Sequence, residues 1–423
     1  MLLSFRVSNH RSLRDEQQLL LTPAYHDDDS RDDRQAVPVV AVFGANASGK
    51  SNVLDALVYM RNMVRGSLRE SEPGTGVARH PFALDPAARD EPSTYVVDLL
   101  LQGVRYTYGF AVDDSHVVEE WMFSYPRKKK REIFHRRGDD YAIGDRSPAS
   151  MHQVAAITES NVLFLSVAAR SKQDLVRPVY GWFAEILYRN PLKLRYPRLS
   201  AVVDALERPG YLDRMTSLLR AADTGIESAE IIEESDADLA QRSARIKALD
   251  GYAPARRKEI LFRHRGEHGT FPLNLRDQSF GTQTLYDLGV AVFRALDAGS
   301  VLIVDELDSS LHPYLTAQLV RLFRDPELNT NGAQLIFSSH DASLLGRVQG
   351  EEVLKRDHVW FTEKNECGVT ELFSLADFKP RREDNRERRY LAGRYGAVPV
   401  VRDQLFAMAL AERREADDVP SNS

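Results

Sequence analysis

The segment Gly44–Ser51 restricts the possible folds of this chain more than any other stretch. Its sequence is Gly-Ala-Asn-Ala-Ser-Gly-Lys-Ser, and it lies between the apolar run Val39–Phe43 and the helix-like run Asn52–Met60. Glycines let successive backbone N–H groups converge on an anion, and the N-terminus of the following helix adds its dipole. A strand, a glycine-rich turn, Lys-Ser and a helix in this order predict a phosphate-binding P-loop in an α/β fold, rather than an ordinary glycine-rich turn.

The residue types in this loop suggest a role for several side chains. Lys50 can reach the β- and γ-phosphates of a nucleotide, and the Ser51 hydroxyl can bind Mg²⁺. We therefore expect ATP and Mg²⁺ as cofactors, although the sequence does not decide between ATP and GTP. The residues assigned to nucleotide binding are Gly44, Asn46, Gly49, Lys50, Ser51, Asn52 and, from the N-terminal region, Arg11.

Length and composition limit the remaining classes of protein. The 423 residues allow about two or three domains. A net charge of −6 argues against binding a polyanion by bulk charge, but local basic patches remain open. Cys367 is the only cysteine, which rules out a disulfide framework or a cysteine-based zinc site within one chain. With no signal peptide and no apolar run of transmembrane length, we expect a cytoplasmic protein.

Hydrophobic patterning outlines the elements around the P-loop. Residues 1–22 are expected to form two strands joined by a polar turn, followed by a charged, solvated loop at 27–34. Four strand-like runs between Thr94 and Arg136 predict an antiparallel sheet inserted after the P-loop helix. Residues 160–250 are expected to be mostly helical, with no sustained heptad pattern.

A second group of candidate residues follows two later apolar strands. Asp305 and Glu306 end the run Val301–Val304, and His340 follows Leu335–Ser339. Because ligands bind at the carboxyl ends of parallel strands, these side chains should lie beside the P-loop. Asp305 would hold Mg²⁺ through water, Glu306 would orient and deprotonate the attacking water, and His340 would contact the γ-phosphate. The alternatives are a solvated carboxylate turn and an ordinary histidine.

The segment Asp277–Gln283 precedes the helix that leads into the strand ending at Asp305. Ser279 and Gly281 would lie at the N-terminus of this helix, which is suited to a second phosphate contact. A serine N-cap followed by glycine is equally the start of an ordinary helix. The position of this segment between the P-loop and Asp305 favours the phosphate contact.

The order of these motifs resembles that of the ABC-type ATPases of the SMC, RecF and overcoming-lysogenization-defect (OLD) group. More closely, the chain resembles the AAA/ABC-type ATP-binding proteins of RloA and abortive-infection systems. Val7–Leu13 and Asp305–Pro313 carry the broader likeness. The closer likeness is carried by His80–Phe82, Tyr106–Phe110, Glu132–Phe134 and Tyr390–Pro399. The resemblance implies an ATP hydrolase with an α/β fold: an ABC-type P-loop ATPase head with an antiparallel β insert and a helical insert.

On this resemblance the chain is expected to divide into six parts. Residues 1–90 and 266–350 would form the two parts of the ATPase core, separated by an antiparallel β subdomain at 91–150 and the helical insert at 151–265. Residues 351–412 would complete the core or dock a partner, and 413–423 would be a disordered tail.

The resemblance also implies how the protein would work. Each ATP would lie between the P-loop of one subunit and the trans signature, Ser279 and Gly281, of the other subunit of a head-to-tail homodimer, so that ATP favours the closed dimer. Ser-Phe-Gly-Thr in place of Ser-Gly-Gly argues against a transporter subunit, and no Q-loop glutamine is identifiable. No nuclease domain follows His340, so an effector nuclease, such as a TOPRIM or RloB-like protein, should be a separate polypeptide.

Three functional classes remain open. The first is a nucleotide-switched sensor or scaffold in an antiviral, abortive-infection type system, and the second is a RecF- or SMC-like DNA-binding ATPase in repair or maintenance. The third is a non-hydrolysing scaffold, against which the intact acidic pair and His340 argue. Nucleic acid could bind a basic run, although a charged hairpin tip is commonly a solvated turn. That run is Arg127, Lys128, Lys129, Lys130 and Arg131, and a second, mixed cluster includes Arg381 and Arg382.

Overall fold

The computed structural model describes residues 1–24, 35–193, 202–222, 224–237, 239–240, 242–244, 256–379, 384–399, 405 and 408. Three predicted features lie outside these residues: the charged loop at 27–34, the pair Arg381–Arg382 and the tail at 413–423.

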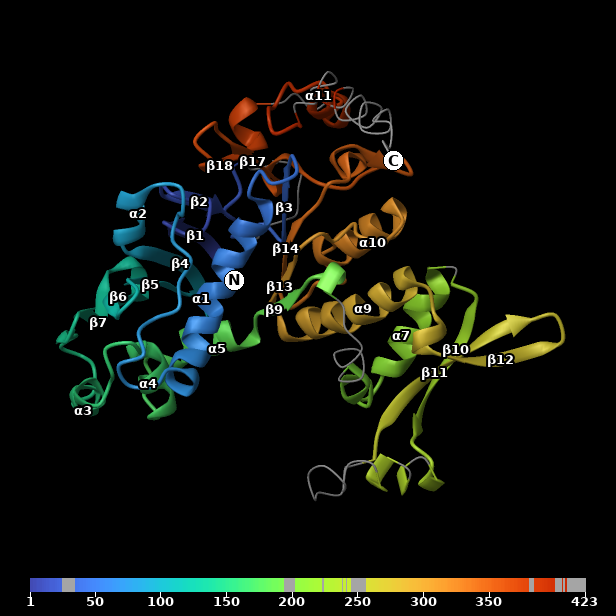
Figure 1. Cartoon of the computed structure of the whole chain (residues 1–423), viewed down its shortest axis with the longest axis horizontal. Helices are drawn as coiled ribbons and strands as arrows, with labels where there is room; N and C mark the ends of the chain where they lie inside the picture. The colour runs from blue at the N-terminus through green and yellow to red at the C-terminus, as the bar shows by residue number, and fades with distance from the viewer. Residues whose placement is uncertain are drawn as a thin grey trace, which may run out of the picture.

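The P-loop strand lies inside a six-stranded, mostly parallel sheet (Figure 1). The strand order is β18 (Thr370–Ser374), β17 (Val359–Lys364), β3 (Val39–Gly44), β14 (Gln334–Ser338), β13 (Val301–Val304) and β9 (Leu187–Arg189). Only β18 is antiparallel to its neighbour. Because β3, β14 and β13 are adjacent and parallel, the segments that follow them meet at one edge of the sheet.

Both faces of this sheet are buried, which explains the continuous apolar runs of its strands. Val40 and Val42 of β3 belong to a hydrophobic cluster shared with α1 (Lys50–Glu70). The alternate residues of β3 belong to a second cluster, which they share with α9 (Phe280–Ala298) and α10 (Pro313–Arg324). The P-loop therefore connects the buried strand β3 to α1, which packs on the same sheet.

A seven-stranded antiparallel sheet lies on the other side of α1 (Figure 1). Its order is β2 (Gln17–Leu20), β1 (Leu2–Ser8), β4 (Ser93–Leu101), β5 (Val104–Val112), β6 (Val117–Tyr125), β7 (Arg131–Arg137) and β8 (Asp140–Ile143). The predicted strands are present, but β1 pairs with β4, so the N-terminal hairpin and the predicted insert form one sheet. Strand patterns in a sequence identify strands without identifying their partners.

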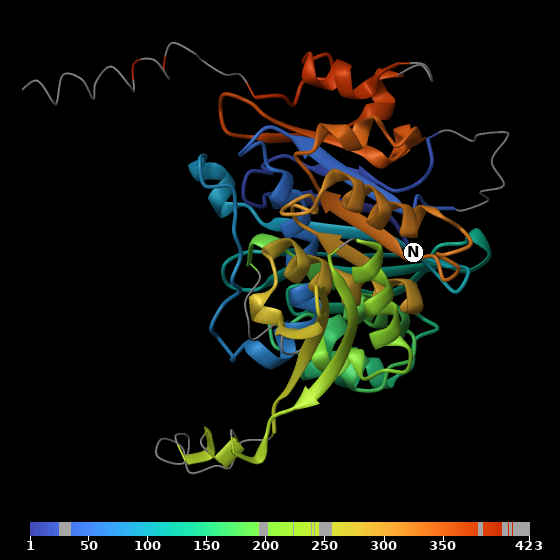
Figure 2. The same ribbon diagram turned by 90° about the vertical axis from the view of Figure 1, so that its right-hand side faces the viewer.

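Residues 151–265 contain strands as well as helices. The helices include α3 (Ser150–Ala156), α4 (Phe164–Arg170), α5 (Arg177–Glu185) and α7 (Tyr211–Ala221). Strand β9 joins the core sheet, while β10 (Ile226–Glu233) pairs with β11 (Lys258–Gly266), which pairs with β12 (Gly269–Asn274). Figure 2 shows the pair β10–β11, in yellow-green, projecting from the body. The three residues of β9 are too few to show a strand period.

The remaining elements are short and lie mainly near the C-terminus. Among the described residues they include α2 (Pro86–Asp90), β15 (Arg347–Val348), β16 (Glu351–Glu352) and α11 (Arg386–Leu391). On α11, the Tyr390 ring stacks on Phe361 of β17 with ring centroids 5.5 Å apart, which fixes α11 to the core sheet. The predicted α/β fold class, with its P-loop core and antiparallel β-sheet, is confirmed.

A fully buried ion pair fastens the antiparallel sheet to α4. Glu120 accepts hydrogen bonds from the backbone N–H groups of Phe164 and Leu165, at 2.7 and 3.0 Å, at the N-terminus of α4. The Tyr108 hydroxyl donates a third hydrogen bond at 3.0 Å. Arg136 lies 3.9 Å from the same carboxylate, and both side chains are 0% exposed. The helix N-terminus and the guanidinium group together stabilise this buried negative charge.

Replacing Arg136 with methionine should strongly destabilise the protein, because Glu120 would lose its counter-charge. Breaking a buried pair typically lowers the free energy of unfolding by about 3–5 kcal/mol. The matched control is Arg137→Met on the same strand, since the Arg137 side chain is 74% exposed and pairs at the surface with Glu119. Urea unfolding followed by tryptophan fluorescence measures both variants, and equal unfolding midpoints would contradict this role for Arg136.

Candidate functional site

The P-loop connects the carboxyl end of β3 to the first turn of α1. Gly49, just before α1, has a φ of 110°, and a Cβ there would collide with the Thr370 side chain, so the position requires glycine. Lys50 Nζ folds back over the loop and donates to the carbonyls of Gly44 and Ala45 at 2.9 and 3.0 Å. The loop therefore closes around the lysine ammonium group, while Asn46 is exposed at its tip.

A chain of side-chain hydrogen bonds ties the loop to distant segments. Thr370 Oγ1 donates to the Ser48 carbonyl at 2.8 Å and lies 2.7 Å from Ser12 Oγ. Asn52 Nδ2 donates to Ser12 Oγ at 2.6 Å, and Ser48 Oγ lies 2.7 Å from Thr362 Oγ1. Asn52 is thus engaged with the N-terminal turn. The sequence analysis missed the three partner hydroxyls, because single serines and threonines in separate segments form no motif.

Burial changes the acidity of Lys50, whose residue is only 5% exposed. Removal from water lowers the pKa of Lys50 to about 8, although the carboxylates of Glu306, Asp305 and Asp308 act to raise it. A phosphate entering the loop would add negative charge and raise this pKa again. A lysine with a shifted pKa beside several carboxylates is typical of a functional site.

Asp305 is the central hydrogen-bond acceptor of the site. Its Oδ1 accepts from Ser51 Oγ at 2.9 Å and from Ser338 Oγ at 2.7 Å, and its Oδ2 accepts from Asn190 Nδ2 at 3.1 Å. These residues lie on α1, at the end of β14 and just after β9, so Asp305 joins three elements. A carboxylate beside a hydroxyl fits Mg²⁺, which prefers oxygen ligands and usually adds phosphate oxygens and waters. The sequence analysis did not single out Asn190 or Ser338.

Glu306 and His340 lie together at the same edge of the sheet. His340 Nε2 is 4.0 Å from Glu306 Oε1, and the two side chains are 37% and 28% exposed. The Glu306 backbone has a φ of 61° and its N–H donates to Ser338 Oγ at 2.7 Å. A non-glycine residue in this conformation is strained, and such strain clusters at functional sites. The predicted adjacency of Asp305, Glu306 and His340 is present in the structure.

Arg11 lies beside α1, one turn beyond the P-loop. Its Nε donates to Asp55 Oδ2 at 2.5 Å, and the buried His10 ring lies 3.0 Å from the same oxygen. Burial acts to raise the pKa of Asp55, but hydrogen bonds from His10 and Arg11 lower it to about 2. The Arg11 side chain is 41% exposed and is held by Asp55, so its role in nucleotide binding stays a prediction.

Ser279 and Gly281 lie at the N-terminus of α9, as the sequence predicts. Ser279 is the N-cap, with its Oγ accepting from the Thr282 N–H at 3.1 Å, and it is exposed. A Cβ at Gly281 would lie 2.8 Å from the Ser310 carbonyl oxygen, so glycine permits the segment after Asp305 to pack closely. Ser279 therefore serves as the N-cap of α9, and its exposure also leaves room for the predicted phosphate contact.

The basic run Arg127–Arg131 forms the tip between β6 and β7. Its first four residues are exposed, and Arg127 and Lys128 have positive φ values of 53° and 61°. Lys130 Nζ lies 3.8 Å from the centroid of the Phe123 ring. Phe123 precedes the run on β6, and the hairpin turn brings Lys130 back over it. Arg131 is used locally, donating to the Arg146 carbonyl at 2.9 Å.

Comparison with known proteins adds the family. Residues 39–346 match the family model described as "AAA domain, putative AbiEii toxin, Type IV TA system". The chain belongs to this family. The matched residues include the P-loop, the signature segment, Asp305, Glu306 and His340. No curated protein matches the chain.

Two solved structures are similar over most of their length. One is the SmcHead bound to the C-winged helix domain of ScpA, at 12% identity and a TM-score of 0.46, covering 89% of this chain and 99% of that one. The other is the SMC head domain from Thermotoga maritima, at 15% identity and a TM-score of 0.41, covering 88% and 98%. No helix among the described residues is long and apolar enough to cross a membrane.

Binding of ATP and Mg²⁺ should take up protons near pH 8. At that pH about half of the Lys50 amines are neutral, and the phosphates would raise their pKa so that they become protonated. Calorimetric titrations in buffers of different ionisation enthalpy should give about half a proton per nucleotide, and much less about two pH units lower. Lys50→Arg, which stays charged, is the control. Heats that do not depend on the buffer would contradict the shifted pKa.

Proposed function

We propose that this protein is a Mg²⁺-dependent ATPase that works as a nucleotide-operated switch, with ATP held between two copies arranged head to tail. The observation that carries the proposal is the convergence on one sheet edge of the P-loop, Asp305 and the Glu306–His340 pair. Membership of an AAA family supports nucleotide binding by this edge. The hydrolytic residues, the metal ligands and the dimer are our proposal.

Each side chain has a defined task in this proposal. Lys50 would exchange its contacts with the loop carbonyls for phosphate oxygens, to which its ammonium group is attracted. Ser51 and Asp305 would hold Mg²⁺, which when bound neutralises charge on the phosphates. Glu306, whose backbone N–H is fixed by Ser338, would accept a proton from the attacking water. His340, close to Glu306, would respond to the γ-phosphate.

The trans signature requires a second copy of the chain. Ser279 and Phe280 are exposed and Gly281 is partly exposed, so the start of the helix is available to an anion held by another subunit. Contacts made only through the γ-phosphate would stabilise the closed dimer with ATP and release it after hydrolysis. A ligand shifts such an equilibrium only by its difference in affinity for the two states, and the γ-phosphate supplies that difference.

We further propose that the switch acts in antiviral defence of the abortive-infection type and controls a separately encoded effector nuclease, such as a TOPRIM or RloB-like protein. The support is the family description, which names a putative AbiEii toxin and a Type IV TA system. Residues 351–412 are the proposed docking region, and the six-part division and the cytoplasmic location belong to the same proposal.

The alternative is a RecF- or SMC-like DNA-binding ATPase, which the exposed tip Arg127–Lys130 favours. Two observations weigh against it. Arg131 donates to the Arg146 carbonyl, and Lys130, although exposed, lies over the Phe123 ring, so two of the five cations already have a contact within the chain. The chain as a whole carries a net charge of −6, which opposes approach to a polyanion. We therefore prefer the defence switch.

The substitution Glu306→Gln should preserve ATP binding but lower turnover by at least about 100-fold, as expected for loss of a general base. The neutral amide keeps the size of the side chain but cannot take a proton from water. ATP should then accumulate in the site and hold the closed dimer. Phosphate release and light scattering with ATP–Mg²⁺ measure the two effects, with the co-expressed genomic neighbour added in one sample.

The matched control is Glu363→Gln on the exposed end of β17, which should turn over ATP like the parent chain. Parental turnover by Glu306→Gln would remove Glu306 from the proposed mechanism. A monomeric Glu306→Gln variant with ATP bound would contradict the proposed dimer. Retention of duplex DNA in place of the neighbour would favour the alternative function.

A further inference from the structure

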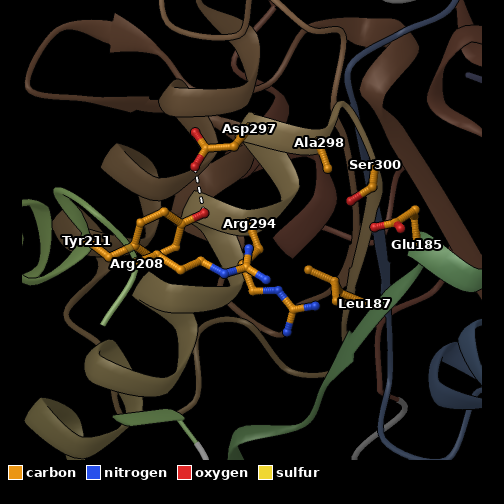
Figure 3. Close-up of a pocket in the computed structure, with 8 residues that line it drawn as sticks. All are labelled: Glu185, Leu187, Arg208, Tyr211, Arg294, Asp297, Ala298 and Ser300. Carbon is orange, nitrogen blue, oxygen red and sulfur yellow. Dashed lines mark hydrogen bonds between the residues drawn. The ribbon is translucent and has the colours of Figure 1, made fainter. Parts of the chain in front are cut away.

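A pocket of about 320 Å³ lies where α5, β9, α7 and the C-terminal end of α9 meet (Figure 3). Its volume is at the lower end of the range for small-molecule sites. Ser300, in its wall, precedes β13, whereas Asp305 follows the carboxyl end of that strand. Five residues of extended chain span roughly 16 Å, so the pocket and the proposed ATP site lie at opposite edges of the sheet.

Two arginines and two carboxylates, Glu185 and Asp297, supply the charged groups of the pocket. Figure 3 shows the guanidinium groups of Arg208 and Arg294 beside each other in the pocket that both residues line. Asp297, also in the wall, is already engaged: it accepts from the Tyr211 hydroxyl at 2.6 Å and from Arg214 Nη1 at 2.8 and 3.0 Å. Arg294 forms no hydrogen bond or ion pair with any residue in the described part of the chain. Its charge is available to a ligand.

Ser300 adds an independent sign of a missing partner. The residue is only 5% exposed, and its Oγ is buried without a hydrogen-bond partner in the described part of the chain. Buried hydroxyl groups in native proteins are almost always paired, because an unpaired one loses its hydration without compensation. Since Ser300 lines the pocket, a ligand oxygen there would supply the partner.

We propose that this pocket binds a small phosphorylated metabolite of at most about mononucleotide size. The planar guanidinium groups of Arg208 and Arg294 match phosphate oxygens, and Ser300 Oγ adds a third hydrogen bond. Leu187 offers an apolar surface for the rest of the ligand, and the Glu185 carboxylate can accept from a ligand hydroxyl. Neither arginine takes part in the proposed ATP site.

The walls of the pocket continue into that site. Strand β13 connects Ser300 to Asp305, and β9 connects Leu187 to Asn190, which donates to Asp305. Arg294 lies near one end of α9, and Ser279 caps the other end. A bound metabolite would therefore change the affinity of the proposed ATP site through Asp305 and Ser279. ATP would change the affinity for the metabolite by the same factor, because such coupling is reciprocal. This coupling rests on the proposed function, whereas the binding itself does not.

Titration calorimetry of the full-length Lys50→Ala chain with AMP, and with inorganic phosphate as its fragment, tests the proposal. Loss of Lys50 weakens the P-loop, so that the remaining heat reports on the pocket. We expect at least one probe to bind with a dissociation constant below about 10 mM. Adding Arg294→Met should weaken that binding at least about tenfold, because a charge-assisted bidentate contact is lost.

Two further variants separate binding from structure. Ser300→Ala should weaken binding by about threefold or more while leaving the Tm unchanged or higher, because the Oγ makes no hydrogen bond that would be lost. Arg220→Met, an exposed arginine of α7 outside the pocket, should bind like the Lys50→Ala parent. Absence of binding by both probes, or equal binding by the Arg294→Met and Arg220→Met variants, would overturn the pocket. A separate measurement of ATP hydrolysis by the unaltered chain tests the proposed function, and its result does not depend on whether the pocket binds a ligand.

Discussion

The arrangement of the site depends on the carboxylate of Asp305. It accepts hydrogen bonds from Ser51 on α1, Asn190 just after β9 and Ser338 at the end of β14, which lie 254, 115 and 33 residues away in the chain. Hydrogen bonds to a charged group contribute about 1.5–3 kcal/mol each, so this single carboxylate aligns the P-loop helix with two strands. Ser338 extends the alignment to Glu306 by accepting its backbone N–H. The order of the parallel sheet makes these contacts possible, because β14 lies between β3 and β13.

The elements that carry motifs could be predicted from the sequence. The apolar run into Gly44 and the helix after Lys50 lie on either side of the glycine-rich loop, whose sequence fixes where the strand ends and where the helix begins. The same holds for the placement of Asp305 and His340, since both follow short, fully buried strands. A strand buried on both faces has a continuous apolar sequence, so the local pattern is enough to predict where such a strand lies.

Features created by tertiary pairing could not be predicted. The pairing of β1 with β4, the three-residue strand β9 and the contact of Asn190 with Asp305 depend on which segments meet, not on local composition. The same reason hid Phe123 beneath Lys130, because the stacking requires the hairpin to fold back. Burial of Lys50 and the strained backbone of Glu306 likewise result from packing. Shifted pKa values and backbone strain both cluster at functional sites, which supports the assignment of the sheet edge as the candidate site.

The central claim is that ATP binds between two subunits, and mixed subunits test it most directly. Ser279→Asp keeps an N-cap but places a negative charge towards the phosphates, and the neutral Ser279→Asn is its control. Ser279→Asp and Lys50→Ala should each be inactive alone, while an equal mixture regains about a quarter of the parental ATPase activity: half of the dimers are mixed, each with one intact site. An inactive mixture, or a fully active Ser279→Asp variant, would contradict the shared site.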